Sequence, residues 1–263
     1  MNKWKRIVVK VGTSTLCYSG GRLNLRHIEK LCKVLSDIQN SGKEVLLVSS
    51  GAIAMGVGKL GLAKKPPDIA GKQACAAVGQ CELMYVYDKL FSEYNHNVAQ
   101  ILLTGEDLQN EKRRENFVNT LQKLIHLRTI PVLNENDTMS TTEITSIGDN
   151  DTLAAMVAEN AGADLLVLFS DIDGLYTTDP RVKKNASLIP VVHEIDEHIR
   201  SLAGGAGTDQ GTGGMATKVY AADICLKNNI DMIITNGDHP ESLYDILDGK
   251  SVGTIFTRKE SAV

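Results

Sequence analysis

The chain has 263 residues, of which 43% are hydrophobic, and its formal net charge is −4. This length and composition suit one large α/β domain or two small ones, and they exclude a disordered chain. The acidic balance and the aromatic content of 5% give no sign of a nucleic-acid-binding surface.

Targeting signals and cysteine clusters are not evident. The apolar run near the N-terminus is too short for a signal peptide and no span of about 20 apolar residues follows, so we expect a cytoplasmic protein with no membrane contact. The cysteines lack Cys-x-x-Cys spacing and the histidines are scattered, which predicts neither a disulfide framework nor a metal site. The residues that we expect to be small buried hydrophobic side chains are Cys17, Cys32, Cys75, Cys81 and Cys225.

Short apolar runs, typical of buried parallel strands, alternate along the chain with helical patterns. The predicted strands are residues 6–11, 44–49, 98–103, 130–134, 164–169 and 231–235. The predicted helices begin with residues 25–38, which stop at Ser41-Gly42, and continue near 71–94, 113–127, 151–161, 214–228 and 240–247. This alternation predicts a three-layer α/β/α sandwich with a central, mostly parallel sheet, formed by a single domain over residues 1–263.

Several loops follow the predicted strands, and ligands of open α/β sheets lie beyond the carboxyl ends of the strands. Residues 10–14 (KVGTS) place a lysine beside a glycine whose amide could approach a phosphate, although a solvated lysine beside a turn is the simpler alternative. Residues 49–51 (SSG) then lead into a helix of small residues. The amides of that helix would favour an anion, or Ser50 would only cap the helix.

Two acidic segments come next. Residues 134–139 (NENDTM) follow a strand, so a carboxylate there could hold an ammonium group, or the segment could simply form a turn. Residues 148–151 (GDND) precede a helix that Asp149 or Asn150 could cap, but two aspartates exceed what capping requires.

The last two segments suit a nucleotide. Residues 169–181 (FSDIDGLYTTDPR) are polar and carry Tyr176, which fits a pocket for a base and ribose or else a surface excursion. Residues 209–218 (DQGTGGMATK) miss the phosphate-loop pattern because Thr217 precedes Lys218. Even so, Gly213-Gly214 lead into a helix with Lys218 one turn inside, where amides, helix dipole and ammonium could converge on one anion.

In this order and at these separations, KVGTS, SSGAIAMG, NENDT, GDND, SDIDGLYTTDPR and GTGGMATK closely resemble the glutamate 5-kinases of the amino acid kinase family. The resemblance covers essentially the whole chain. Acetylglutamate kinases and aspartokinases typically carry a second glycine where this chain has Thr13. Uridylate and isopentenyl phosphate kinases carry a glycine triplet where it has Ser49-Ser50-Gly51.

The resemblance implies that ATP phosphorylates the γ-carboxylate of L-glutamate to give L-glutamyl 5-phosphate, the first step of proline biosynthesis. The catalytic residues that it implies are Lys10, Lys218 and Asp151, with Asp151 orienting the two ammonium groups. Those implied to bind glutamate are Ser50, Asp137 and Asn150, and those implied to offer amides to the phosphate are Gly51 and Ala52. The implied ATP-binding residues are Lys10, Gly12, Ser170, Asp171, Thr212, Gly213, Gly214, Met215, Ala216, Thr217 and Lys218.

The resemblance also implies partners and limits. Magnesium would be bound mainly through the ATP phosphates and by no dedicated protein ligands. About residues 1–165 would bind glutamate and about 166–263 would bind ATP. We expect a homo-oligomer without nucleic-acid partners, no C-terminal PUA domain, and inhibition by proline, for which residues 134–150 are the candidate contact.

Three other functions are alternatives to this one. A kinase for another small carboxylic or carbamic acid would use the same machinery on a different acceptor. A dinucleotide-binding oxidoreductase would need a Gly-x-Gly-x-x-Gly pattern, and the first strand is followed by one glycine only. A non-catalytic nucleotide sensor is disfavoured because Lys10, Asp151 and Lys218 are present together.

Overall fold

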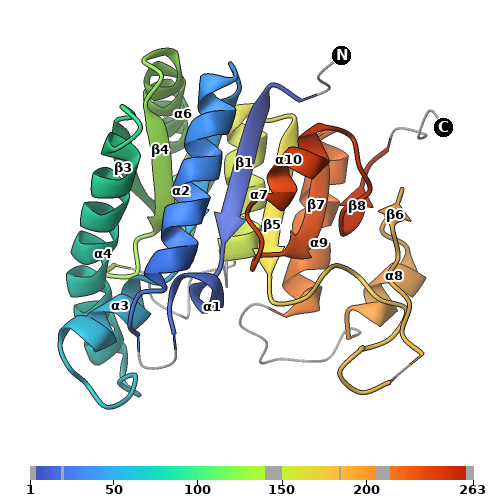
Figure 1. Ribbon diagram of the computed structural model, residues 1–263, viewed down its shortest axis with the longest axis horizontal. Coiled ribbons are helices and arrows are strands. Elements are labelled where there is room, and N and C mark those ends of the chain that lie inside the picture. Colours follow the sequence, from blue (N-terminus) through green and yellow to red (C-terminus); the bar gives the residue numbers. More distant parts are fainter. Residues whose placement is uncertain (1–3, 19–20, 140–149, 184, 205–213, 259–263) are drawn as a thin grey trace.

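One eight-stranded sheet organises the residues that the computed structural model describes, which are 4–18, 21–139, 150–183, 185–204 and 214–258. Its strand order is β3-β4-β2-β1-β5-β7-β8-β6 (Figure 1). The strands are β1 (Arg6–Val11), β2 (Glu44–Ser49), β3 (Val98–Leu103), β4 (Ile130–Glu135), β5 (Leu165–Ser170), β6 (Val191–Val192), β7 (Asp231–Asn236) and β8 (Thr254–Phe256). Only the pair β7–β8 is antiparallel among the strand pairs of the described residues.

Helices cover both faces of this sheet. They are α1 (Thr13–Leu16), α2 (Leu25–Asn40), α3 (Ala52–Lys59), α4 (Ile69–Ser92), α5 (Gly105–Gln109), α6 (Glu111–His126), α7 (Asn150–Ala161), α8 (Glu197–Leu202), α9 (Met215–Lys227) and α10 (Ser242–Leu247). Buried residues of α2, α3, α4 and α10 pack on one face, and those of α6, α7 and α9 pack on the other. In Figure 1, α2 and α10 cross in front of the sheet, while α7 and α9 lie behind it.

The predicted α/β/α architecture is confirmed, and the predicted strands and helices end within two residues of the observed ones. The elements that were not predicted are α1, α5, α8, β6 and β8, each of at most six residues. Such short segments do not show a hydrophobic period, so their sequences could not reveal them.

Strand β1 explains why the predicted strands read as continuous apolar runs. Its side chains alternate between the two faces: Val8 belongs to the core beneath α7 and α9, whereas Ile7 and Val9 belong to the core beneath α2 and α4. Since both faces are covered, both sets are apolar. By the same alternation, Lys10 lies on the side of α7 and α9.

Glycines bring α3 and α4 into backbone contact. A Cβ atom on Gly56 would lie 1.8 Å from the carbonyl oxygen of Cys75, and one on Gly79 would lie 1.8 Å from the carbonyl oxygen of Ala52. Any larger residue at either position would push the helices apart. The contact therefore fixes the N-terminus of α3 against α4.

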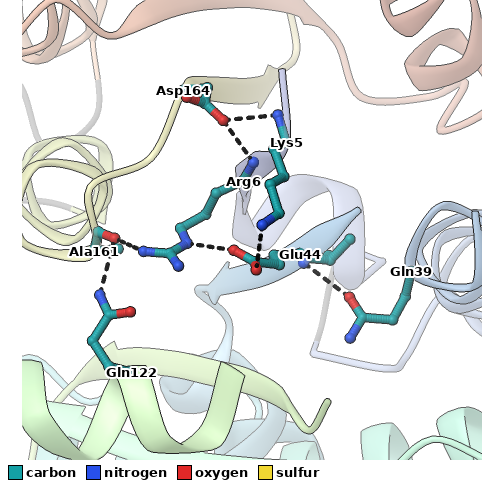
Figure 2. A network of polar contacts seen from close by, with 8 residues as sticks. Lys5, Arg6, Gln39, Glu44, Gln122, Ala161 and Asp164 are labelled. Carbon is teal, nitrogen blue, oxygen red and sulfur yellow. Dashed lines mark hydrogen bonds and ion pairs between the residues drawn. The ribbon is translucent and has the colours of Figure 1, made fainter. Parts of the chain in front are cut away.

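A polar network connects the amino ends of the central strands (Figure 2). The loops that contain the predicted site residues begin at the opposite, carboxyl ends of these strands. Arg6 Nε donates to Glu44 Oε2 at 2.8 Å, and the Arg6 guanidinium also reaches the carbonyl oxygen of Ala161. Asp164 Oδ2 accepts from the backbone N–H groups of Lys5 and Arg6 at 2.7 and 2.8 Å. Gln39 Oε1 accepts from the N–H of Val45 at 2.9 Å. These contacts tie β1, β2 and the loop before β5 together.

The cysteine prediction is confirmed at Cys17, Cys32, Cys75 and Cys225, which are buried, but it is wrong at Cys81, which is exposed. Cys81 lies on α4, whose buried residues nearest to it are Gln80 and Leu83. Within the part of the chain that is described, no helix combines the length and the apolar character needed to cross a bilayer.

Candidate active site

A cavity of about 1050 Å³ lies at the carboxyl ends of the central strands. Strand β1 has β2 on one side and β5 on the other, so the chain changes direction across the sheet at this point. Such switch points are where open α/β sheets bind ligands. The predicted site residues that line the cavity are Lys10, Gly12, Ser50, Gly51, Ala52, Asp137, Asn150, Ser170, Asp171 and Lys218.

A lysine–aspartate–lysine cluster forms the floor of this cavity. Asp151 Oδ1 lies 2.5 Å from Lys10 Nζ and Asp151 Oδ2 lies 2.9 Å from Lys218 Nζ. Asp151 has an exposed fraction of 0%, and the two lysines are also buried. Burial by itself would raise the pKa of Asp151, but the two ammonium groups outweigh it and hold that pKa below its ordinary value.

The three side chains come from distant parts of the chain. Lys10 lies in β1, Asp151 in the first turn of α7 and Lys218 in the first turn of α9. One carboxylate balances only one of two ammonium groups, so these three side chains together carry one net positive charge in a buried place. An anionic ligand is the natural complement to that charge.

Backbone amides face the same cavity from the other layer of helices. Gly51, the N-cap of α3, has φ +102°, a left-handed conformation that strongly favours glycine. The first amides of a helix have no partner within the helix, so those at Gly51 and Ala52 are suited to an anion. Gly12 precedes α1 in the same way on the β1 side.

A chain of side-chain hydrogen bonds joins two of the three predicted glutamate-binding residues, Ser50 and Asn150. Asn150 Nδ2 donates to Ser50 Oγ at 2.8 Å and to Asn134 Oδ1 at 3.0 Å. Asn134 Nδ2 in turn donates to Gln80 Oε1 at 2.9 Å. The segment containing Asn134 was among the candidates, but Gln80 was missed, because a glutamine inside a predicted helix carries no signal of a functional role.

Asp137 lies at the rim of the cavity and is half-buried. Burial and, to a smaller extent, the carboxylate of Glu135 raise the pKa of Asp137 to about 6, against the opposing charge of Lys65. Lys64 and Lys65 line the cavity as well, from the loop between α3 and α4. Neither lysine was among the predicted site residues.

The remaining predicted residues are distributed as follows. Gly214 is the N-cap of α9, and Met215, Ala216 and Thr217 form its first turn beside Lys218, without lining the cavity. Thr217 Oγ1 also lies 3.4 Å from Asp151 Oδ2. Thr212 and Gly213 lie outside the described residues, as do residues 140–149 of the predicted proline contact.

Tyr176, expected near a nucleotide base, donates its hydroxyl hydrogen to Asp173 at 3.0 Å and does not line the cavity. Ser170 and Asp171, at the end of β5, are hydrogen-bonded to each other at 3.2 Å. Within the described residues, no three His, Cys, Asp or Glu side chains gather into a metal-binding group.

The sequence of the chain matches known proteins over most of its length. Residues 5–236 match the amino acid kinase family. The chain is 54% identical over 259 residues to a glutamate 5-kinase of Clostridium perfringens (strain 13 / Type A), covering 97% of this chain and 96% of that protein. It is 55% identical over 252 residues to a glutamate 5-kinase of Clostridium tetani (strain Massachusetts / E88), covering 96% and 94%.

Solved structures share the fold at much lower sequence identity. The UMP kinase from Bacillus anthracis has a TM-score of 0.65 at 16% identity, covering 98% of this chain and 97% of that one. The isopentenyl phosphate kinase of T. acidophilum has a TM-score of 0.66 at 19% identity, covering 96% and 100%. At these identities the likeness concerns the fold alone.

Proposed function

The chain belongs to the amino acid kinase family, alongside its glutamate 5-kinases, and on that premise we propose that it phosphorylates the γ-carboxylate of L-glutamate with ATP. The product is L-glutamyl 5-phosphate, an acyl phosphate that starts proline biosynthesis. The observation that carries this proposal is the Lys10–Asp151–Lys218 cluster at the floor of a cavity that is also lined by Asp137 and by the start of α3.

The chemistry requires positioned charge more than covalent help. A γ-carboxylate oxygen of glutamate attacks the γ-phosphorus, the bond from that phosphorus to the β–γ bridging oxygen breaks, and ADP leaves, with no net proton transfer. Negative charge spreads over the transferring phosphoryl group and the bridging oxygen. Lys10 would stabilise the transferring group and Lys218 the bridging oxygen.

Asp151 would keep these two ammonium groups in place. Without the carboxylate between them they would repel each other in a buried site. Because both ammonium groups are already oriented by Asp151, little reorganisation is needed when the phosphates arrive, and such preorganisation is the main source of electrostatic catalysis. The amides at Gly12, Gly51 and Ala52 would bind the phosphoryl oxygens.

Glutamate recognition falls to Ser50, Asp137 and Asn150 in this proposal. An ionised Asp137 would pair with the α-ammonium group, a charge-assisted contact worth roughly 1.5–3 kcal/mol. N-acetylglutamate has no such ammonium and would be bound poorly. The raised pKa of Asp137 means that acidic solution should weaken glutamate binding by protonating this carboxyl.

ATP would occupy the part of the cavity nearest to Ser170, Asp171 and the start of α9. When bound, magnesium would supply charge neutralisation at the phosphates. The donor set of the cavity fits an ion carried in by those phosphates, because Asp151 is already engaged by two lysines and Asp137 serves the ammonium. Inhibition by proline and assembly into a homo-oligomer stay predictions.

The test is the acceptor specificity of the purified protein. Hydroxylamine traps acyl phosphates as hydroxamates, so hydroxamate formation with ATP and each candidate acid identifies the acceptor. We expect L-glutamate to give product and N-acetylglutamate, aspartate and carbamate to give little or none. Preference for one of the other acids would replace this proposal by a kinase of that acid.

A further inference from the structure

We propose that Gln80 is a positioning residue that holds the far end of the hydrogen-bond chain ending at Ser50, so that the Ser50 hydroxyl stays oriented to donate to a substrate carboxylate. This inference rests on the proposed function. It concerns a residue of α4 that is buried (8% exposed) and does not line the main cavity, although it lines a smaller neighbouring cavity that shares Ala52 and Asp137 with the main one.

The direction of the chain can be read from one backbone group. The N–H of Glu135 donates to Asn134 Oδ1 at 2.9 Å. A backbone N–H can only donate, so this atom of Asn134 must be the amide oxygen, and the nitrogen must face Gln80. The Gln80 atom that meets it at 2.9 Å must therefore be the accepting oxygen.

The same logic passes from Asn134 to the cavity. Because Asn134 Oδ1 accepts, the Asn150 atom 3.0 Å from it must be the donating nitrogen. The same nitrogen donates its second hydrogen to Ser50 Oγ at 2.8 Å. Ser50 Oγ is thus an acceptor within the protein, and its own hydrogen finds no acceptor among the described residues.

A hydroxyl group whose hydrogen is still available for donation suits a carboxylate, which only accepts hydrogen bonds. A hydroxyl has one hydrogen to donate, and the chain leaves that hydrogen for the cavity. If the chain ran the other way, Ser50 would donate to Asn150 and offer a lone pair to the substrate. A lone pair would repel a carboxylate oxygen, so the direction of the chain selects for acidic substrates.

Gln80 holds the far end of this chain. Its carbonyl oxygen is the acceptor that Asn134 Nδ2 needs in a buried place, and without it the Asn134 amide would have to rotate or shift to find another partner. Either movement would disturb Asn150 and release Ser50. Gln80 therefore acts on the substrate only through three other side chains.

The experiment compares Gln80→Met with the matched control Gln39→Met. Both glutamines are buried and accept hydrogen bonds through Oε1, but Gln39 belongs to the polar network at the amino ends of the strands (Figure 2) and does not line the cavity at their carboxyl ends. Gln80→Met should raise the KM for glutamate about tenfold, the effect of one lost hydrogen bond, and leave the KM for ATP within about twofold. Gln39→Met should lower the melting temperature without changing the KM for glutamate.

A double-mutant cycle separates positioning from a general structural effect. If Gln80 acts through Ser50, the variant Gln80→Met with Ser50→Ala should have a KM for glutamate within about threefold of Ser50→Ala alone. Additive effects, or an unchanged KM in Gln80→Met, would overturn the inference. Should Gln80→Met not fold, Gln80→Asn withdraws the oxygen by one methylene and is read by the same criteria.

Failure of the proposed function would look different. In that case the unmodified protein itself would form no hydroxamate with glutamate, and no comparison of variants would be needed. A wild-type protein that phosphorylates glutamate while Gln80→Met keeps the wild-type KM would refute the role of Gln80 alone.

Discussion

Replacing Asp137 by asparagine should stabilise the protein at neutral pH while weakening glutamate binding. The folded state raises the pKa of Asp137 from 3.8 to about 6. Above pH 6 the carboxyl is ionised in both states, and the folded state bears the cost of burying that charge beside Glu135. Below pH 3.8 it is protonated in both states and the cost disappears.

The size of the effect follows from the shift. About two pKa units correspond to about 3 kcal/mol of unfolding free energy. Since Asp137 keeps part of its surface in water, solvent screening makes the effect smaller. We expect Asp137→Asn to raise the free energy of unfolding by about 1–2 kcal/mol at pH 8. For a chain of this size that is a rise in melting temperature of about 3–6 °C. At pH 5 about half of the gain should remain, because only part of the range between the two pKa values has been crossed.

Urea unfolding of the wild type and Asp137→Asn at pH 5 and pH 8 measures this gain, and calorimetry measures glutamate binding. Asp88, an exposed residue of α4, provides the control, since Asp88→Asn should change neither quantity. An equal gain at both pH values would show that the amide simply packs better. A loss of stability at pH 8 would refute the reasoning, because it would mean that the ionised carboxylate stabilises the fold.

Other variants probe the cavity floor and its supports. Lys218→Ala should lower kcat by about a hundredfold or more and change the KM for glutamate little, as expected for charge needed in the transition state; an unchanged kcat would make Lys218 structural. Asp151→Asn should lower the unfolding free energy by about 3–5 kcal/mol, measured in urea, because it removes the carboxylate that pairs with both Lys10 and Lys218 in a buried place; an unchanged unfolding free energy would mean that water reaches the site more than its burial indicates. Gly79→Ala should lower the free energy of unfolding by about 1–3 kcal/mol and raise the KM for ATP, because the new methyl group meets the carbonyl oxygen of Ala52 and displaces α3. A KM for ATP equal to that of the wild type would show that the N-terminus of α3 keeps its place.

The sequence was most informative where structure depends on local pattern. Strands such as β1 and β5 are apolar runs because both faces of the sheet are covered, and their boundaries could be predicted from that alone. Helix α4 is the counterexample. It buries Leu83 and Tyr87 but exposes Tyr85 and Cys81, so its apolar residues form no clear stripe and the exposure of Cys81 could not be predicted.

The site depended on contacts that no spacing encodes. Lys10, Asp151 and Lys218 are far apart in the sequence, and the resemblance to known kinases, not the pattern of residues, brought them together. The structure places them within ion-pair distance. Neither the resemblance nor the pattern of residues pointed to Gln80. Its position in the hydrogen-bond chain follows from a contact between the side chains of α4 and β4, which only the structure reveals.

The cavity takes its lysine cluster from one layer of helices and its amides from the other. Lys218 and Asp151 belong to the α7 and α9 side of the sheet, and Gly51 and Ala52 belong to the α3 side. A nucleotide held by both groups would bridge the two layers beyond the end of the sheet. We expect such a ligand to restrain the movement of the two helix layers relative to each other until it has dissociated.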